Sequence, residues 1–518
     1  MIRKKLPIGI QTFSEIREGN YYYVDKTPLI LDLLDNGKYY FLSRPRRFGK
    51  SLMLDTIAEL FEGNKALFEG LYAENHWDWS KTAPVLRFNF AVGQVRIAED
   101  LDMFILSMLK ENQQRLGLSC EGFSERDVAS CFSHLIREAH KQTGKKVVIL
   151  IDEYDKPILD NITKPELARE MREGLRNLYS VIKGMDAHIQ FAMLTGVSKF
   201  SKVSLFSGLN HLRDITVSSE YSAICGYTDE DVDSVFAPEL EGLDREEIRR
   251  WYNGYNWTGT SVYNPFDLLL LFQEREFRSY WFETGTPTFL VDLLTNRNTF
   301  TPDLAKRMSN EALLSSFDVD DIATEALMFQ AGYLTIRGIQ RIGVQQRFVL
   351  GYPNREVESS LNEVLLRRYT AAEGETVQIS SNLYEALLVN DFERIKQLFT
   401  AFYASIPNDW YRNNPIAQFE GYYASVFYSY FASLGFEIRL EDVTNRGRID
   451  MTVLFNNQIY IIEFKVVETA PEGKAMAQLK ERNYADKYQA HQQPIYLIGV
   501  EFSKEAKGLV GFEVETIV

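Results

Sequence analysis

The sequence predicts a mixed α/β protein with a parallel-sheet domain, a mainly helical middle region and a C-terminal α/β/α domain. Three observations predict this class. Short apolar strands alternate with amphipathic helices over the first ~225 residues, helical segments dominate from about 226 to 375, and a helix–strand–strand–helix–strand order begins near 415. We therefore expect domains at 1–225, 226–375 and 376–518, the last including a helical linker over ~376–414.

Four apolar segments of the first domain are typical of strands in one sheet. Val147–Ile151 is apolar at every position, as expected for a parallel strand that is buried on both faces. Because helical stretches separate the segments, the sheet is expected to be largely parallel. The other three predicted strands are Tyr39–Ser43, Val85–Phe90 and Ile189–Leu194.

A basic, glycine-containing segment, Arg44–Ser51, follows the first strand and precedes an apolar helix, Leu52–Phe61. Backbone N–H groups at the start of such a helix, together with its dipole, favour a phosphate. Gly49 permits close approach of the backbone, and Lys50 is placed to reach the β- and γ-phosphates of a nucleotide. Arg44 stands where the GxxxxGK[ST] pattern has its first glycine, and a chance Gly-Lys-Ser in a basic turn is the alternative. The candidate nucleotide-binding residues of this loop are Arg46, Arg47, Phe48, Gly49, Lys50 and Ser51.

The third predicted strand ends in two acids, as a Walker B element does. Asp152 would hold Mg²⁺ together with the hydroxyl of Ser51, and Glu153 would orient or deprotonate the attacking water. Thr195 ends the next strand, where a polar side chain can sense the γ-phosphate. Acids at a strand end are common, but their combination with Gly-Lys-Ser after another strand predicts binding of ATP with Mg²⁺.

A second group of charged residues lies in the predicted C-terminal hairpin. Asp450 is near the start of the strand Ile449–Phe455, and Glu463 and Lys465 share one face of its partner, Ile459–Val466. Two carboxylates and a backbone carbonyl suit Mg²⁺ or Mn²⁺, which polarises a scissile phosphate and activates a bound water. Lys465 would stabilise charge on the phosphoryl oxygens. The alternative is an ordinary Glu463–Lys465 ion pair beside an unrelated aspartate.

Two flanking helices add candidates to this second group. Glu420 begins the predicted helix 418–434 and would supply a further metal-facing carboxylate. Gln478, in the predicted helix 472–490, would contact the site or the nucleic-acid backbone. In the middle region, residues 329–351 predict a helix end followed by a β-hairpin, as in a small winged-helix lid.

Composition limits the function classes. Acidic residues outnumber basic ones, 72 to 57, so the chain is not a general nucleic-acid coat and its contacts with DNA must be local. The three cysteines show no CxxC spacing, which argues against a disulfide framework or a structural zinc site. No apolar run reaches eighteen residues, so we expect a cytoplasmic protein without a membrane span.

With these motifs in this order, the chain resembles bacterial proteins that join an AAA-ATPase-like domain to a C-terminal PD-(D/E)XK nuclease-superfamily domain. The resemblance implies a P-loop NTPase domain, a helical, winged-helix-like middle and a restriction-endonuclease-like α/β/α domain. It also implies that the missing first loop glycine is normal for the family, and it suggests roles in defence or mobile elements. The segments that carry it are Tyr22–Thr27, Arg44–Ser51, Ile151–Asp155, Thr195–Gly196, Phe206–Asn210, Trp251–Tyr255, Tyr263–Pro265, Arg448–Asp450 and Glu463–Lys465.

The expected function is ATP-controlled or ATP-powered, metal-dependent cleavage of nucleic acid, with DNA favoured over RNA. The expected catalytic residues are Glu153, Asp450, Glu463 and Lys465. The alternative is a nucleotide-dependent switch or remodelling ATPase whose nuclease-like domain only binds nucleic acid or a partner. The sequence leaves the oligomeric state open.

Overall fold

The chain forms two compact units, Met1–Gly285 with Arg307–Asn354 and Thr286–Lys306 with Arg355–Val518. The computed structural model describes residues 3–91, 93, 95, 97–118, 127–199, 211–285, 290, 294, 308–314, 317–318, 321–369, 373–405 and 420–517. The domain boundaries at 225 and 375 stay predictions. Within the described ranges, no helix is both long and apolar enough to cross a membrane.

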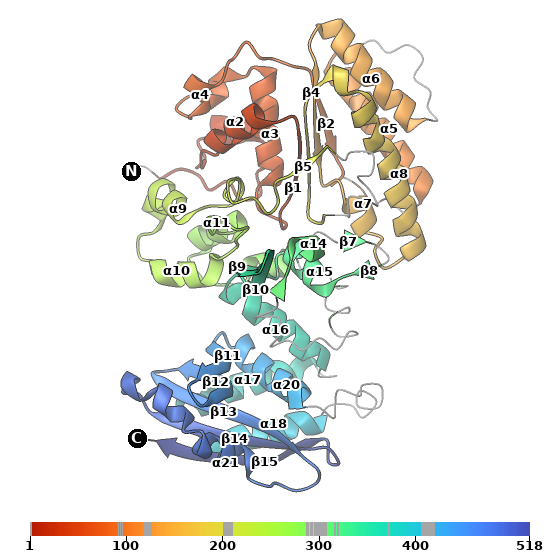
Figure 1. Cartoon of the computed structure of the whole chain (residues 1–518). Helices are drawn as coiled ribbons and strands as arrows, with labels where there is room; N and C mark the ends of the chain where they lie inside the picture. The colour runs from red at the N-terminus through yellow and green to blue at the C-terminus, as the bar shows by residue number, and fades with distance from the viewer. Residues whose placement is uncertain are drawn as a thin grey trace. The chain divides into compact units, whose positions relative to one another are not determined.

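The first unit is built on a five-stranded parallel sheet with the order β2-β3-β4-β1-β5 (Figure 1). The predicted parallel sheet is thus confirmed, but β5 was not predicted because two residues carry no pattern. Every residue of β1 and β3 is buried, since helices cover both faces of the sheet. The strands are β1 Tyr39–Ser43, β2 Val85–Asn89, β3 Val147–Asp152, β4 Ile189–Gly196 and β5 Arg213–Asp214.

Helices lie on both sides of this sheet, with α2, α3 and α4 on one side and α5, α6 and α8 on the other (Figure 1). The helix after the basic loop begins at Lys50, two residues earlier than predicted, and ends at Glu62, directly before Gly63, whose backbone is left-handed. The helices are α1 Phe13–Glu18, α2 Thr27–Asn36, α3 Lys50–Glu62, α4 Ala73–His76, α5 Ala98–Arg115, α6 Val128–Thr143, α7 Lys156–Leu159 and α8 Pro165–Gly184.

The rest of the first unit is mainly helical and ends in a hairpin. Its helices bury apolar side chains against Tyr22 and Val24 of the N-terminal segment in one shared core. The predicted helix end and hairpin are confirmed as α15 Thr324–Ala331, β9 Thr335–Ile342 and β10 Gln345–Gly351, with β6 Met308–Ser309 beside β10. The remaining elements are α9 Asp229–Val235, α10 Arg245–Tyr252, α11 Pro265–Glu274, α12 Tyr280–Gly285, α14 Glu311–Leu314, β7 Phe317–Asp318 and β8 Asp321–Ile322.

The second unit holds a five-stranded mixed sheet in the order β11-β12-β13-β14-β15, in which only β13 and β14 pair in parallel. The helix α21 makes the crossover between those two strands. The strands are β11 Glu437–Thr444, β12 Gly447–Phe455, β13 Gln458–Val467, β14 Ile495–Ser503 and β15 Gly508–Ile517. The helices are α16 Arg355–Tyr369, α17 Glu373–Leu388, α18 Phe392–Ser405, α20 Glu420–Ser433 and α21 Lys474–Glu481.

Three details of the predicted C-terminal order were wrong. The edge strands β11 and β15 were not predicted, because charged and apolar residues mix along them and most of these residues lie only half-buried at the sheet margin. The predicted helix 472–490 ends at Glu481 and gives way to two short 3₁₀ turns. The left-handed backbone of Asn483 accounts for the break, since a helix cannot continue through that conformation.

Candidate nucleotide and metal sites

The basic loop joins β1 to α3 through two left-handed residues, Arg47 (φ 69°) and Gly49 (φ 87°). Glycine takes this conformation without steric cost, so the chain turns at Gly49 directly into the helix. No described side chain caps the start of α3. The first N–H groups of this 13-residue helix are therefore available to an anion, as the sequence predicts.

The ammonium of Lys50 is buried between this loop and the end of β3. Its Nζ donates to the carbonyl oxygens of Arg44 (3.1 Å) and Pro45 (3.2 Å) and lies 3.5 Å from Oε1 of Glu153. Glu153 itself has a left-handed backbone (φ 52°), which is unfavourable for a glutamate. The structure thus brings together the loop lysine and the second acid of the Walker B element.

The carboxylate of Asp152, at the end of β3, links the start of α3 to the end of β4. Ser51 Oγ donates to its Oδ2 (2.5 Å), and Thr195 Oγ1 donates to its Oδ1 (2.7 Å). Thr195 reaches it because β4 lies between β1 and β3. Burial raises the pKa of Asp152, and the neighbouring Glu153 adds to the rise. A buried carboxylate beside a hydroxyl fits a hydrated Mg²⁺, whose charge would favour the ionised form.

A cavity of about 390 Å³ opens beside the loop. At one end it is lined by Arg46, Arg47 and the residues from Phe48 to Ser51, with Glu153 close by. The remaining wall comes from segments that the sequence did not assign to the site, although Tyr23 falls in the motif Tyr22–Thr27. Polar and charged loop residues on one part of the lining and largely apolar side chains on the rest would suit a nucleotide. The apolar part includes Ile10, Tyr23, Tyr227, Phe266 and Leu269.

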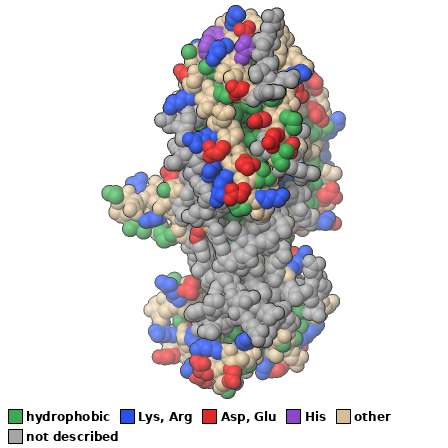
Figure 2. Space-filling view, turned by 90° about the vertical axis from the view of Figure 1, so that its right-hand side faces the viewer, with side chains coloured by type: hydrophobic (Ala, Val, Ile, Leu, Met, Phe, Trp, Pro, Cys, Tyr) green, Lys and Arg blue, Asp and Glu red, His purple; other side chains and the backbone are tan. Residues whose placement is uncertain are grey.

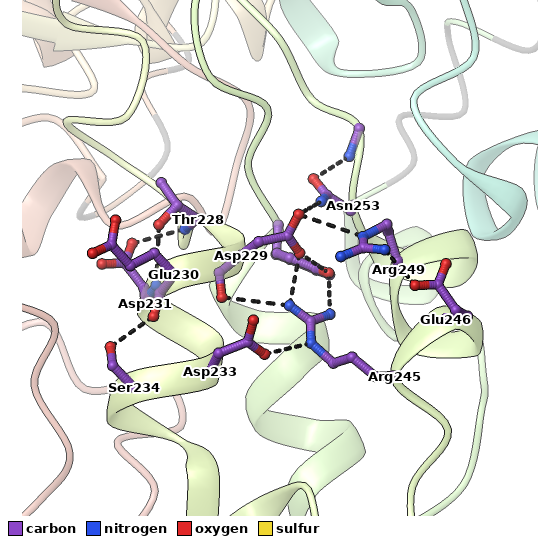
Figure 3. Close-up of polar contacts among 12 residues, drawn as sticks. Thr228, Asp229, Glu230, Asp231, Asp233, Ser234, Arg245, Glu246, Arg249 and Asn253 are labelled. Carbon is purple, nitrogen blue, oxygen red and sulfur yellow. Dashed lines mark hydrogen bonds and ion pairs between the residues drawn. The ribbon is translucent and has the colours of Figure 1, made fainter.

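A network of charged side chains joins α9 and α10 (Figure 3). Asp229 accepts hydrogen bonds from Tyr263 Oη (2.7 Å) and Arg245 (2.7 Å), and Arg245 also donates to Asp233 (2.7 Å). The backbones of Tyr227 and Tyr263 pair with each other, so the network positions a residue that lines the cavity. Lys26, also on the cavity wall, donates to Asp231 at 2.6 Å.

Asp25 has a structural role in the neighbouring motif. Its Oδ1 accepts from the backbone N (2.9 Å) and Oγ1 (2.7 Å) of Thr27, and its Oδ2 accepts from the backbone N of Tyr72 (2.7 Å). These bonds close the start of α2 and tie it to the turn before α4. Asp25 therefore fixes the backbone of a motif whose neighbouring residues Tyr23 and Lys26 line the cavity.

The C-terminal hairpin brings Asp450, Glu463 and Lys465 together. Asp450 precedes Met451, which pairs with Ile462 of the neighbouring strand β13. The Oδ2 of Asp450 accepts a hydrogen bond from the backbone N of Phe464 at 2.8 Å. Glu463 is fully buried, and its Oε1 accepts from Lys465 Nζ at 3.2 Å. Lys465 also donates to the carbonyl oxygen of Phe464 at 2.9 Å. The three side chains thus meet at one place on β12 and β13.

The second oxygen of Glu463, Oε2, is buried and has no hydrogen-bond partner in the described part of the chain. Burial, and after it the carboxylate of Asp450, raises the pKa of Glu463 to about 7. A buried, unpaired carboxylate oxygen beside a second carboxylate is costly unless a cation or a proton neutralises it. Asp450 and Glu463 therefore fit a divalent metal. The described residues hold no group of three or more His, Cys, Asp or Glu side chains suited to a metal, and the side chain of Glu420 lies outside them.

Gln478 reaches the same carboxylate from α21, donating its Nε2 to Glu463 Oε1. The close approach of α21 depends on Gly499 of β14, where an added Cβ would lie 2.7 Å from the backbone N of Met476. Gln478 was singled out from the sequence. Gly499 was missed, because its role exists only where helix and strand pack together.

Comparisons with known proteins match two regions of this chain to family models. Residues 7–206 match the family model of a predicted AAA-ATPase, and residues 418–510 match the PD-(D/E)XK nuclease superfamily. An uncharacterized protein in the vnfD 5′ region of Azotobacter chroococcum mcd 1 is 65% identical over 518 residues, covering 100% of both chains. This chain belongs to the AAA-ATPase-like proteins with a C-terminal PD-(D/E)XK nuclease-superfamily domain. No solved structure matches it.

The two matched regions of this AAA-ATPase-like protein do not cover the whole candidate nucleotide site. The loop, the Walker B acids and Thr195 fall within 7–206, and the carboxylates of the hairpin fall within 418–510. Tyr227 and Phe266 of the cavity wall lie beyond the first match. The cavity is therefore completed by the helical part of the first unit.

Proposed function

We propose that this protein hydrolyses ATP at the loop cavity and cleaves nucleic acid with a divalent metal at the hairpin, ATP controlling or powering the cleavage. The observation that carries the proposal is the buried Oε2 of Glu463, which lies beside Asp450 and Lys465 and has no hydrogen-bond partner among the described residues. An ordinary surface ion pair would leave no oxygen buried without a partner. DNA is the favoured substrate, and defence or mobile elements are the proposed setting.

Five side chains, at the start of α3 and at the ends of β3 and β4, would act in ATP hydrolysis. The N–H groups at the start of α3 and the ammonium of Lys50 would bind the phosphates and stabilise the charge on the γ-phosphoryl oxygens. The carboxylate of Glu153 would orient the attacking water and accept its proton. Ser51 and Asp152 would hold Mg²⁺, which neutralises phosphate charge when bound. Thr195 keeps the Asp152 carboxylate in position through its 2.7 Å hydrogen bond.

At the hairpin, Asp450 and Glu463 would hold Mg²⁺ or Mn²⁺, which polarises the scissile phosphate and lowers the pKa of a bound water. Lys465, whose side chain is 25% exposed, can reach a phosphate and stabilise its developing charge. Gln478 holds Glu463 Oε1 and so orients the carboxylate. Within the described residues, the buried cysteines Cys131 and Cys225 form no disulfide, which suits the reducing cytoplasm that the sequence predicts.

The test is cleavage of plasmid DNA by the full chain with Mg²⁺ or Mn²⁺, with and without ATP. Asp450→Asn should abolish cleavage and spare ATP turnover, whereas Lys50→Ala should abolish turnover and alter cleavage. An Asp35→Asn variant, at an exposed position of α2, controls for the loss of one carboxylate. If ATP is hydrolysed but neither DNA nor RNA is cut, the switch or remodelling alternative replaces the proposal.

A further inference from the structure

The hairpin of β9 and β10 projects from the first unit, and its outer half is exposed on both faces. All residues from Ile339 to Gln346 are exposed. The apolar side chains there include Ile342, which is 58% exposed, and Val344 at the turn, which is fully exposed. Figure 2 shows a narrow projection, at the height of β9 and β10 in Figure 1, whose surface is mostly green, blue and tan. Apolar side chains presented this way on a thin projection suit insertion into a partner.

The charge of this hairpin is opposite to that of the chain. Residues Thr335–Gly351 contain three arginines, three glutamines and no acid, in a protein whose net charge is −15. Neither Arg341 nor Arg347 pairs with a carboxylate in the described ranges, and Arg347 donates to Gln345 Oε1 at 2.6 Å. Surface arginines elsewhere in this unit, such as Arg169 and Arg176, do pair with glutamates. The hairpin is therefore a local basic element, complementary to a polyanion.

The strand register places one of these arginines on each face of the ribbon. Arg341 pairs with Gln346, and Arg347 pairs with Gln340, which is the neighbour of Arg341 along β9. Since successive residues of a strand point to opposite faces, Arg341 and Arg347 lie on opposite faces, each beside a glutamine. A flat surface could meet only one face of such a ribbon. A groove with phosphates along both walls can meet both.

We propose that the β9–β10 hairpin enters a groove of duplex DNA. The major groove of B-form DNA admits a two-stranded β-ribbon, whereas the major groove of A-form RNA is too deep and narrow for side-chain readout. Arg341 and Arg347 contact the phosphates of the two walls. The glutamine amides face base edges, and Ile342 and Val344 contact apolar groups such as thymine methyls. The choice of nucleic acid as the partner rests on the proposed function. The further inference is that the β9–β10 hairpin is the element that binds it.

The base of the hairpin is held firmly in the first unit. The backbone N of Asn256 donates to Thr335 Oγ1 at 2.7 Å, and Thr335 Oγ1 donates back to the Asn256 carbonyl oxygen at 3.1 Å. Arg337 donates to the carbonyl oxygen of Pro353 at 3.1 Å. Next to Asn256, Trp257 lies against Arg44 of the nucleotide-binding loop. The ribbon is thus presented in one orientation, with its anchor close to the nucleotide site.

The test is binding of the full chain to a fluorescein-labelled duplex of about 20 base pairs, measured by anisotropy in EDTA so that no metal-dependent cleavage occurs. Arg341→Gln/Arg347→Gln is compared with Arg169→Gln/Arg176→Gln, which removes the same charge from α8. At about 0.1 M salt each lost phosphate contact should weaken binding roughly tenfold, and the slope of log K against log salt should fall by about 2 for the pair. The α8 variant should bind like the wild type.

Val344→Asp, at a fully exposed turn residue, is a second variant that should weaken binding while ATP turnover without DNA stays unchanged. Duplex binding by the hairpin variants that equals the wild type would overturn the inference. So would a wild type that binds no duplex DNA, or that prefers duplex RNA or single strands. A cleavage assay distinguishes the two proposals. If the wild type cleaves DNA and the hairpin variants bind duplex as well as the wild type does, the proposed function stands and only the role of the hairpin is rejected. If the hairpin variants lose duplex binding but the wild type cleaves no nucleic acid, only the DNA-binding role of the hairpin is supported.

Discussion

The guanidinium carbon of Arg44 lies 3.8 Å from the ring centre of Trp257, at the loop position where the standard phosphate-binding pattern has a glycine. Arg44 is fully buried and donates to the carbonyl oxygens of Ser43 (2.9 Å), Thr216 (2.9 Å) and Tyr221 (3.2 Å). Burial lowers its pKa to about 10. The loop is therefore braced by a buried cation that joins it to the region after β5.

We predict that Arg44→Ala destabilises the first unit by about 3 kcal/mol or more, because it removes a desolvated cation–π contact and leaves carbonyl oxygens without donors. Nucleotide affinity should fall as well, since the Arg44 carbonyl oxygen accepts from Lys50 Nζ. Urea unfolding and nucleotide titration measure the two effects. Arg46→Ala, an exposed side chain of the same loop, should have little effect on stability. Equal stability losses in both variants would contradict the bracing role.

Glu153→Gln should slow ATP hydrolysis by at least about 100-fold while ATP still binds, because the amide cannot accept the proton of the attacking water. Glutamine keeps the size of the side chain and tolerates the left-handed backbone about as well as glutamate does. Steady-state ATPase assays and equilibrium nucleotide binding separate the two steps. Turnover near the wild-type rate would exclude Glu153 as the base.

Glu463→Gln should preserve or raise the melting temperature of the metal-free protein and abolish its shift on adding Mn²⁺. The amide oxygen can still accept from Lys465 and Gln478, while the buried charge at Oε2 is removed. Thermal unfolding with and without Mn²⁺ measures both changes. Glu441→Gln, at an exposed position of β11, is the matched control and should retain the metal shift. A full metal shift in Glu463→Gln would show that the metal binds elsewhere.

The stability of the first unit should depend on pH through Asp155. Burial, and after it the charge of Glu153, raises the pKa of this carboxyl to about 6. Between about pH 4 and pH 6 the folded protein keeps a proton that the unfolded chain has released, so this group lowers stability as pH rises through that window. Asp155→Asn cannot ionise, and its melting temperature relative to the wild type should rise from pH 4 to 6 and then level off. Melting temperatures of Asp155→Asn and the wild type that change with pH in parallel would refute this prediction. Asp35→Asn, at an exposed position, is the control, and its melting temperature should change with pH in parallel with that of the wild type.

Arg245→Ala should cost more stability than Arg249→Ala, although both arginines contact Asp229 (Figure 3). Arg245 is 23% exposed and bonds to Asp229, Asp233 and Tyr263, so we expect a loss of about 1–3 kcal/mol. Arg249 is 43% exposed and 3.4 Å from Asp229, which predicts less than about 1 kcal/mol. Urea unfolding of each variant measures the difference, and the reverse order would be inconsistent with this network.

Much of the fold could be predicted because buried strands and loop motifs are local patterns. Val147–Ile151 was predicted from its continuous apolar residues and appears as β3 with one further residue, Asp152. The edge strands β11 and β15 were not predicted because half-buried segments of mixed charged and apolar residues also occur in loops. Their pairing depends on β12 and β14, not on their own composition.

The sequence by itself determined which polar and charged side chains stand near the strand ends. They are Lys50 and Ser51 in the helix after β1, the two acids at the end of β3, and the carboxylates of the C-terminal hairpin. Only the tertiary structure decided what surrounds that chemistry. The burial of Arg44 against Trp257 and the closing of the cavity by Tyr227 join segments far apart in the chain. A local pattern fixes how a segment folds, but the contacts between distant segments depend on how all of them pack at once.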